Sequence, residues 1–348
     1  MTGRLFVALC VTLIAAPSLA GPDTADTPRV KTKVKVRNEW ASRYQDSRQG
    51  PEVTERFNRT ARVGRTGALD LTNIAGDVTV TGGGGDEVRI EAVKRVRSRD
   101  EADTKTLLDE LRIEVTELPN RVEVRTLHPR NRRNYSGSVD YTVAMPAGGS
   151  ATLRSVSGNV RVTNVKGELR AESVSGDVIT SGAGRLSLAK SVSGDIQVSD
   201  VSTEGEITAS TVSGGLTARG LKARAIDLGS VSGDVILTDV ACDRATVKTV
   251  SGNLEYNGAL ARSGRYEMTA HSGNVRLAIS GGTGFEVEAT TFSGDVRSDF
   301  PLTLRSGVEG NGERRGRRLN RSIRGSFGDA SAIVNLTSFS GDIVITKR

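Results

Sequence analysis

One six-residue phrase recurs along the second half of the chain and limits what the chain can fold into. It is clearest at residues 173–178, where it reads Ser-Val-Ser-Gly-Asp-Val. Related copies place a Ser-Gly pair at Ser157, Ser175, Ser193, Ser213, Ser232, Ser251, Ser272, Ser293 and Ser340. The first eight serines are 18, 18, 20, 19, 19, 21 and 21 residues apart. Because a unit of roughly 20 residues cannot bury a face alone, this period predicts a stacked repeat.

Alternation within each unit indicates strands. Leu169, Ala171 and Ser173 alternate with Arg170 and Glu172, so the two sets take opposite faces, and both serines of the phrase are expected to point inward. The glycine that follows permits the positive φ of a corner. About 20 residues at ~3.3 Å each make one coil, and coils would stack ~4.8 Å apart. The sequence therefore predicts an all-β fold, a parallel β-solenoid with about 18–21 residues per coil.

The phrase also carries a resemblance to a known family. Together with the closing runs at residues 323–329 and 336–343, it resembles the putative-adhesin family of β-strand-repeat proteins, a domain of unknown function. The resemblance covers roughly residues 62–348. It implies a single-stranded right-handed β-helix at the cell envelope or surface, with no established catalytic residues.

The first twenty residues read as a secretory signal peptide. A single cation, Arg4, precedes an apolar stretch from Leu5 to Ala16, and small residues follow up to Ala20. The chain is therefore expected to be exported and to be periplasmic, envelope-associated or secreted. Cleavage would leave Cys242 as the one cysteine, so no internal disulfide can form and the stacked core must supply the stability. We expect Cys242 to be buried.

Three further segments follow the signal peptide. Residues 21–61 are polar and lack a period, which indicates a linker or arm. Residues 62–148 predict strands and one helix, from Asp100 to about Leu111, that cap one end of the solenoid. Residues 149–348 hold the repeats, with a basic insertion near 305–325.

The insertion supplies the candidate anion-binding residues. These are Arg314, Arg315, Arg317, Arg318, Arg321 and Arg324. They suit phosphate or carboxylate groups on envelope polymers or lipid head groups, whereas the more common role of a charge run is a solvated loop. A smaller cluster of Arg125, Arg130, Arg132 and Arg133 around His128 has the same two interpretations. Nucleic acid is not expected, because no aromatic residues are interleaved for base stacking.

No catalytic, cofactor or metal site is predicted. The acidic series Asp177, Asp195 and Asp234 occupies the turn, where Asn159 and Gly215 stand in other coils. A turn tolerates those replacements and a catalytic carboxylate does not. The chain also lacks the glycine-rich nonapeptide of calcium-binding β-helices, although a calcium ladder along this series stays open.

One column of the repeat is expected to point outward. It contains Val156, Val174, Val192, Val212, Val231, Val250, His271, Phe292 and Phe339. The column is either an apolar ridge that binds a partner or a strand position that a neighbouring strand or arm partly covers.

These observations favour an exported, non-enzymatic β-solenoid that acts as an adhesin or as a structural or interaction protein of the bacterial cell envelope. The expected partners are anionic envelope polymers, lipid head groups or another protein surface, with self-association included. Two alternatives remain: a polysaccharide-acting enzyme on a β-helix scaffold, and a basic binding module for anionic envelope polymers.

Overall fold

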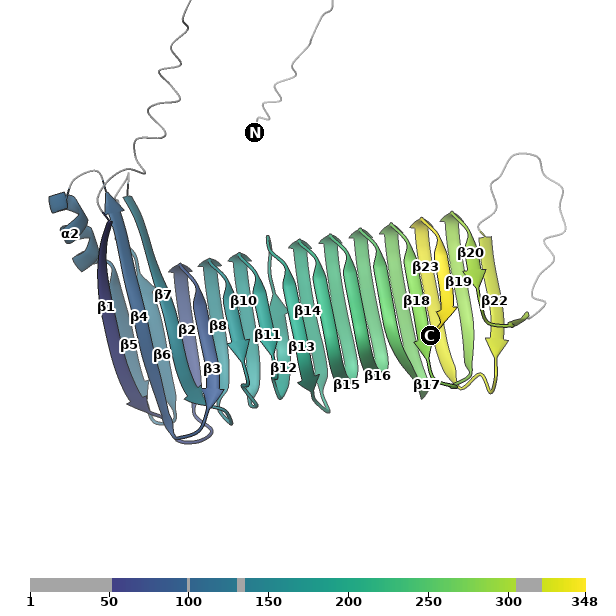
Figure 1. Cartoon of the computed structure of the whole chain (residues 1–348), viewed down its shortest axis with the longest axis horizontal. Helices are drawn as coiled ribbons and strands as arrows, with labels where there is room; N and C mark the ends of the chain where they lie inside the picture. The colour runs from purple at the N-terminus through teal and green to yellow at the C-terminus, as the bar shows by residue number, and fades with distance from the viewer. Residues whose placement is uncertain (1–51, 99–100, 130–134, 305–320) are drawn as a thin grey trace, which may run out of the picture. The chain divides into compact units, whose positions relative to one another are not determined.

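The computed structural model describes residues 52–98, 101–129, 135–304 and 321–348 (Figure 1). Within these residues, 24 strands join one sheet and a single helix lies beside it. The all-β class is confirmed. The sheet is mixed, however, because antiparallel pairs occur near both ends of the series of parallel ones. The predicted signal peptide, residues 1–20, lies outside the described residues.

The middle of the sheet is a stack of parallel coils. Its strands are β8 (Ser150–Ser157), β9 (Val160–Thr163), β10 (Glu168–Ser175), β11 (Val178–Ser181), β12 (Arg185–Lys190), β13 (Ile196–Ser202), β14 (Glu206–Ser213), β15 (Leu216–Ser232), β16 (Val235–Ser251), β17 (Leu254–Ser272) and β18 (Val275–Ser280). Every pairing among them is parallel, and serines of the phrase face each other, as in Ser213 with Ser232. Equivalent residues therefore form straight columns.

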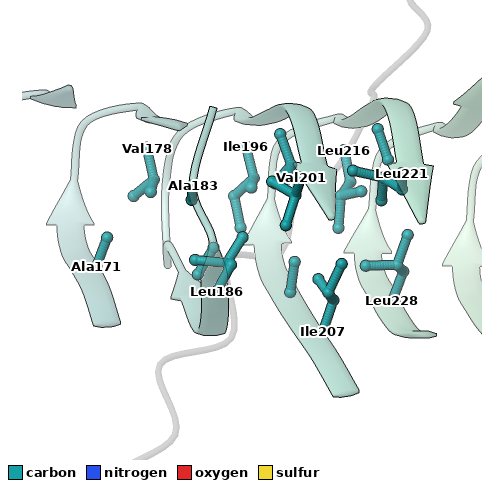
Figure 2. Close-up of a cluster of buried hydrophobic side chains, with 14 of the residues drawn as sticks. Ala171, Val178, Ala183, Leu186, Ile196, Val201, Ile207, Leu216, Leu221 and Leu228 are labelled. Carbon is teal, nitrogen blue, oxygen red and sulfur yellow. The ribbon is translucent and has the colours of Figure 1, made fainter. Parts of the chain in front are cut away.

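The core is built from the inward residue of each alternating pair. Val178, Ile196 and Leu216 on one wall and Leu186 and Ile207 on another are at most 1% exposed, and Figure 2 shows their side chains between the walls. Fully burying each such side chain is worth about 1.5–3 kcal/mol. The periodic apolar positions read from the sequence are the ones that fill this core.

The serine pair departs from the predicted alternation. Ser173 is 3% exposed and points inward, but Ser175 is exposed. The chain bends into its corner at Gly176, so the alternation ends before the second serine. The expectation that both serines face the core is therefore wrong for the second one.

At the N-terminal end the coils are not stacked in sequence order. The strands are β1 (Glu52–Arg62), β2 (Ala68–Ala75), β3 (Val78–Gly83), β4 (Glu87–Ser98), β5 (Arg112–Leu118), β6 (Arg121–Leu127) and β7 (Tyr135–Pro146). The coil of β2 and β3 lies between β8 and β9 on one side and β6 and β7 on the other, all in parallel. Antiparallel partners then extend the edge: β4 joins β7, β1 joins β4 and β5 joins β6.

The predicted capping helix is present as α2 (Glu101–Glu110) beside β4 and β1 (Figure 1). Leu107, Leu108 and Leu111 are 5%, 8% and 0% exposed, so the apolar face of the segment is buried as expected. The predicted arm, 21–61, is wrong for its last ten residues, because Glu52–Arg62 forms β1. As an edge strand, β1 half-buries Val53 and Phe57 and exposes polar neighbours, a composition that resembles a linker.

The C-terminal end repeats this reordering. The strands are β19 (Phe285–Ser293), β20 (Val296–Ser298), β21 (Thr303–Leu304), β22 (Arg321–Phe327), β23 (Ala332–Ser340) and β24 (Ile343–Lys347). The last coil, β23 and β24, lies between β17 and β18 on one side and β19 and β20 on the other. β22 then pairs antiparallel with β19, so residues 321–325 of the predicted basic insertion belong to a strand.

Three phenylalanines pack together near this end. The ring centroids of Phe285, Phe300 and Phe327 lie 4.9–5.7 Å apart. Phe285 and Phe300 are buried, so the cluster belongs to the core beside β22, which pairs with both β19 and β21. Among the described helical residues, none form a segment long and apolar enough to cross a membrane.

Candidate interaction surface

The repeated corner is closed by glycines that admit no side chain. Gly176 has φ of 150°, and a Cβ built on it would lie 2.3 Å from the carbonyl oxygen of Gly158 in the adjacent coil. Gly233 has φ of 155° and would meet the Gly214 oxygen at 2.0 Å. Both the dihedral and the contact exclude a side chain. The positive φ expected from the sequence is confirmed at seven of the nine phrase glycines, and Gly194 and Gly294 are the exceptions.

Buried hydroxyl groups tie each coil to its neighbour at this corner. The Oγ of Ser173 donates to the Gly158 carbonyl at 3.0 Å. The same bond, at 2.9–3.1 Å, is made by Ser191, Thr211, Ser230, Thr249, Thr291 and Ser338. Ser155 is the exception, because its buried Oγ has no partner. The carbonyl it would use, that of Gly76, already accepts from Nδ2 of Asn73 at 2.9 Å.

The Asp and Asn residues after the glycines form a second ladder. Oδ1 of Asn159 accepts the backbone N–H of Asp177 at 2.8 Å, and Oδ1 of Asp177 accepts that of Asp195 at 2.9 Å. Asp and Asn perform the same role, and Asp195 also accepts the N–H of Gly215, which cannot continue the ladder. Within the described part of the chain, no three His, Cys, Asp or Glu residues are grouped to hold a metal ion.

The predicted outward column is an exposed apolar ridge. In stack order, the ridge comprises Ile74, Val156, Val174, Val192, Val212, Val231, Val250, His271, Phe339 and Phe292. Its aliphatic members are 38–48% exposed, and Phe292 and Phe339 are 43% and 49% exposed. No described strand covers the ridge, so cover by a neighbouring strand is excluded among the described residues, whereas residues 21–51 of the predicted arm lie outside them.

Aromatic rings stack at the C-terminal end of the ridge. The rings of His271 and Phe339 lie 4.9 Å apart with 11° between their planes, and those of Phe339 and Phe292 lie 4.9 Å apart at 3°. Sequence reasoning placed all three in the column but missed their order, because β23 inserts between β17 and β19. It also missed Ile74, which an alignment on Gly76 would have found two residues before that glycine.

Opposite charges flank the ridge. The residues two positions before the ridge residues form one column, which we call the basic flank. It contains the cations Arg154, Lys190 and Lys248 and one acid, Glu172. The residues three positions after the ridge residues form a second column, which we call the acidic flank. Its acids are Asp77, Asp177, Asp195, Asp234, Asp342 and Asp295. Because the coils are parallel, each flank keeps to one side of the ridge. A groove of about 360 Å³ runs beside Val156, Val174 and Val192 on the basic side.

The predicted arginine site is not assembled in the described residues. Arg314, Arg315, Arg317 and Arg318 lie outside them, and so does the side chain of Arg321. Arg324 lies in β22 and forms an ion pair with Glu288 of β19. Backbone pairing with β19 places Arg324 in the strand, and the ion pair reduces its capacity to hold a separate anion.

The smaller basic cluster is likewise only partly described. Arg130, Arg132 and Arg133 lie outside the described residues, and Arg125 is 3.5 Å from Glu123. Burial lowers the pKa of His128, which therefore favours its neutral form. A pocket of about 550 Å³ is lined by His128, Thr126 and Ile74 among others, so it adjoins the first residue of the ridge.

The prediction that Cys242 is buried is confirmed. Burial raises the pKa of its thiol to about 11, and a hydrogen bond with Tyr256 partly opposes that shift. The thiol is therefore protonated at neutral pH and is a poor nucleophile.

The fold and its surface define a protein of stacked β-coils with one exposed apolar ridge. Residues 183–346 match the family model described as Toastrack DUF4097. That match covers the coils from β12 onward and includes most of the ridge. No curated protein matches the chain.

Solved structures with similarity to this chain come from several bacteria. A putative adhesin from Bacteroides fragilis is 11% identical, with a TM-score of 0.41, over 84% of this chain and 97% of that one. A putative lipid binding protein from Parabacteroides distasonis is 9% identical, with a TM-score of 0.38, over 84% and 97%. A putative cell adhesion protein from Clostridium sporogenes is 11% identical, with a TM-score of 0.22, over 85% and 100%. The adhesion and lipid binding in these names refer to the three solved proteins and not to this chain.

Proposed function

We propose that this chain is an exported, non-enzymatic β-solenoid that acts as an adhesin or structural interaction protein of the bacterial cell envelope. The ridge is the observation that carries the proposal. Ten coils with ~4.8 Å between neighbours, and so nine spacings, extend it over roughly 43 Å. Exposed apolar surface that is contiguous over such a length is typical of binding sites. The proposal includes two further parts. One is export, which the predicted signal peptide implies, and the other is the right-handed winding that the family resemblance implies.

The distribution of acids supports binding rather than catalysis. Glycoside hydrolysis needs two convergent carboxyl groups. In the groove beside the ridge, Glu172 is the one acid, and it faces the cations Arg154 and Lys190. The described acids of the corner are spread along the ladder, where their Oδ1 atoms accept backbone N–H groups of the next coil.

Binding to anionic envelope material is a second proposal, for Arg314, Arg315, Arg317 and Arg318. Four cations within five positions favour it. Such attraction weakens steeply with salt, since the Debye length is ~8 Å at 0.15 M. Contact through the ridge depends on apolar area and persists at high salt. Salt therefore separates the two modes.

The test is fractionation of cells that express the epitope-tagged full chain. Three chains are compared: the parent, a ridge variant with Val192→Ser and Val212→Ser, and a control with Ile236→Ser. Ile236 is 37% exposed on a strand face away from the ridge, close to the 38% and 43% of the two valines. Circular dichroism establishes that all three are folded.

We expect the parent and the control to remain with the envelope fraction after a wash in about 0.5 M salt, where electrostatic attraction is largely screened. The ridge variant should be released several-fold more. Equal retention of the ridge variant would contradict the proposal, and so would a parent that stays in the cytoplasm. Release of all three chains from the envelope fraction by the salt wash would instead assign envelope binding to Arg314, Arg315, Arg317 and Arg318.

A further inference from the structure

We propose that the ridge is an interface between two copies of this chain, which lie side by side with their coil stacks running in the same direction. The inference rests on the proposed function only in taking the ridge as a binding surface. It assigns the partner and its orientation, neither of which follows from the exposure of the ridge alone.

The size of the surface matches a stable dimer. The ridge is roughly 43 Å long, and the six residues from the basic flank to the acidic flank span about 16 Å, as five steps of ~3.3 Å. Their product is on the order of 700 Å² per copy, near the ~800 Å² per partner of a standard interface. The central column is apolar and the rims are charged, which is the usual anatomy of an interface.

Charge complementarity selects the orientation, chiefly through Lys190, because Arg154 and Lys248 of the basic flank already pair with Asp70 and Glu267 within the chain. A second copy can face the ridge through a two-fold axis that runs along the ridge or through one that crosses it. An axis along the ridge exchanges left and right, so Lys190 of one copy approaches the acidic flank of the other. An axis across the ridge keeps each flank on its side and sets Asp against Asp. Asp77 and Asp295 of the acidic flank pair with Arg161 and Arg297 within the chain. Asp177, Asp195 and Asp234 form no ion pair with a described side chain, so contact between these carboxylates would be uncompensated.

The parallel arrangement also matches the shape of the ridge. Both axes give isologous contacts, but only the axis along the ridge brings every ridge residue against its own counterpart. The stacked rings of His271, Phe339 and Phe292 then oppose the same three rings. Valine opposes valine along the middle. A crossed axis would instead set the aromatic end against Ile74 and Val156.

Disulfide trapping tests both the partner and the orientation. Single variants Val174→Cys and Val250→Cys place a thiol near each end of the valine series, and Ile236→Cys is the matched control off the ridge. Cys242 is 5% exposed, so the parent should give no covalent dimer under mild oxidation. We expect both ridge variants to form dimers and the control to remain monomeric. Trapping at Val212→Cys without trapping at Val174 and Val250 would indicate the crossed axis and overturn the assignment.

Sedimentation velocity of the uncrosslinked chains completes the test. The parent should be dimeric at micromolar concentration, and Val231→Glu should raise the dissociation constant at least tenfold, whereas Ile236→Glu should match the parent. A parent that stays monomeric up to about 100 µM would overturn the inference and leave another protein or a lipid surface as the occupant. A dimeric parent that the envelope does not retain would instead contradict the proposed function and leave this inference standing.

Discussion

The two corners of each coil follow different rules. At the repeated corner, Gly176 lies so close to Gly158 that no Cβ fits. At the opposite corner, Asn164, Gly182 and Asp200 occupy one column with φ of 60°, 65° and 54°. There a Cβ on Gly182 would find its nearest atom at 3.8 Å. Both corners need positive φ, but only the repeated one also needs the absence of a side chain.

The difference explains where the period varies. Strands on the two sides of the repeated corner are separated by two residues, as β10 and β11 are by Gly176 and Asp177, except β12 and β13, which are separated by five. The connections at the opposite corner differ in length from coil to coil, and register shifts occur there, as beside Val240. The variation in coil length, from 18 to 21 residues, therefore occurs at the opposite corner. The repeated corner has a nearly constant length and keeps the ridge residues in register.

The largest effect expected is that of the same substitution at the two corners. Gly176→Asn should lower the free energy of unfolding by about 3 kcal/mol or more, because it adds both dihedral strain and a backbone overlap. Gly182→Asn should cost about 0.5 kcal/mol or less, because Asn adopts this left-handed conformation readily and has room. Urea denaturation of both variants gives the comparison. Equal losses would mean that the repeated corner is not uniquely crowded.

A second pair of variants tests the hydroxyl ladder. Ser173→Ala should cost about 1 kcal/mol, because it removes the hydrogen bond to Gly158. Ser155→Ala should be neutral or slightly stabilising, because the buried Oγ of Ser155 has no partner to lose. The two serines are 3% and 4% exposed, so burial does not separate them. Melting temperatures that fall equally would contradict the assignment of the bond.

The smallest effect is expected in the acidic flank. Replacing Asp177, Asp195 and Asp234 together by Asn should change the free energy of unfolding by less than about 1 kcal/mol. Asn159 already provides the same Oδ1 acceptor, and stacked carboxylates ~5 Å apart repel. Thermal denaturation with and without calcium is the measurement. A calcium-dependent rise in the melting temperature of the parent that disappears in the variant would show a metal ladder instead.

The repeat made the coils and the ridge predictable. Each copy of the phrase repeats the same local chemistry. Comparison of the copies was therefore enough to assign Gly176 to a corner, Ser173 to the core and Val174 to the surface. Their stacking order at the ends could not be read. β23 inserts before β19 in the stack, and the phrase containing Phe339 is the same whichever coil it contacts.

The edge strands were the second feature that the sequence pattern could not predict. Among the described strands β1 pairs with β4 alone, so its burial is partial and its charges are not confined to one face. Likewise, the sequence analysis assigned Arg324 to a basic insertion, but β22 pairs with β19, where Arg324 lies opposite Glu288, 36 residues away. Long-range pairing of this kind leaves no local period.

Mixing two charge variants tests most directly whether identical residues of two chains meet along the ridge. Val231→Lys and Val231→Glu chains should each sediment as monomers, because like charges would face each other across the two-fold axis. An equimolar mixture should restore the dimer, because the lysine of one copy then meets the glutamate of the other. A mixture that stays monomeric while the parent dimerises would contradict the parallel ridge-to-ridge contact.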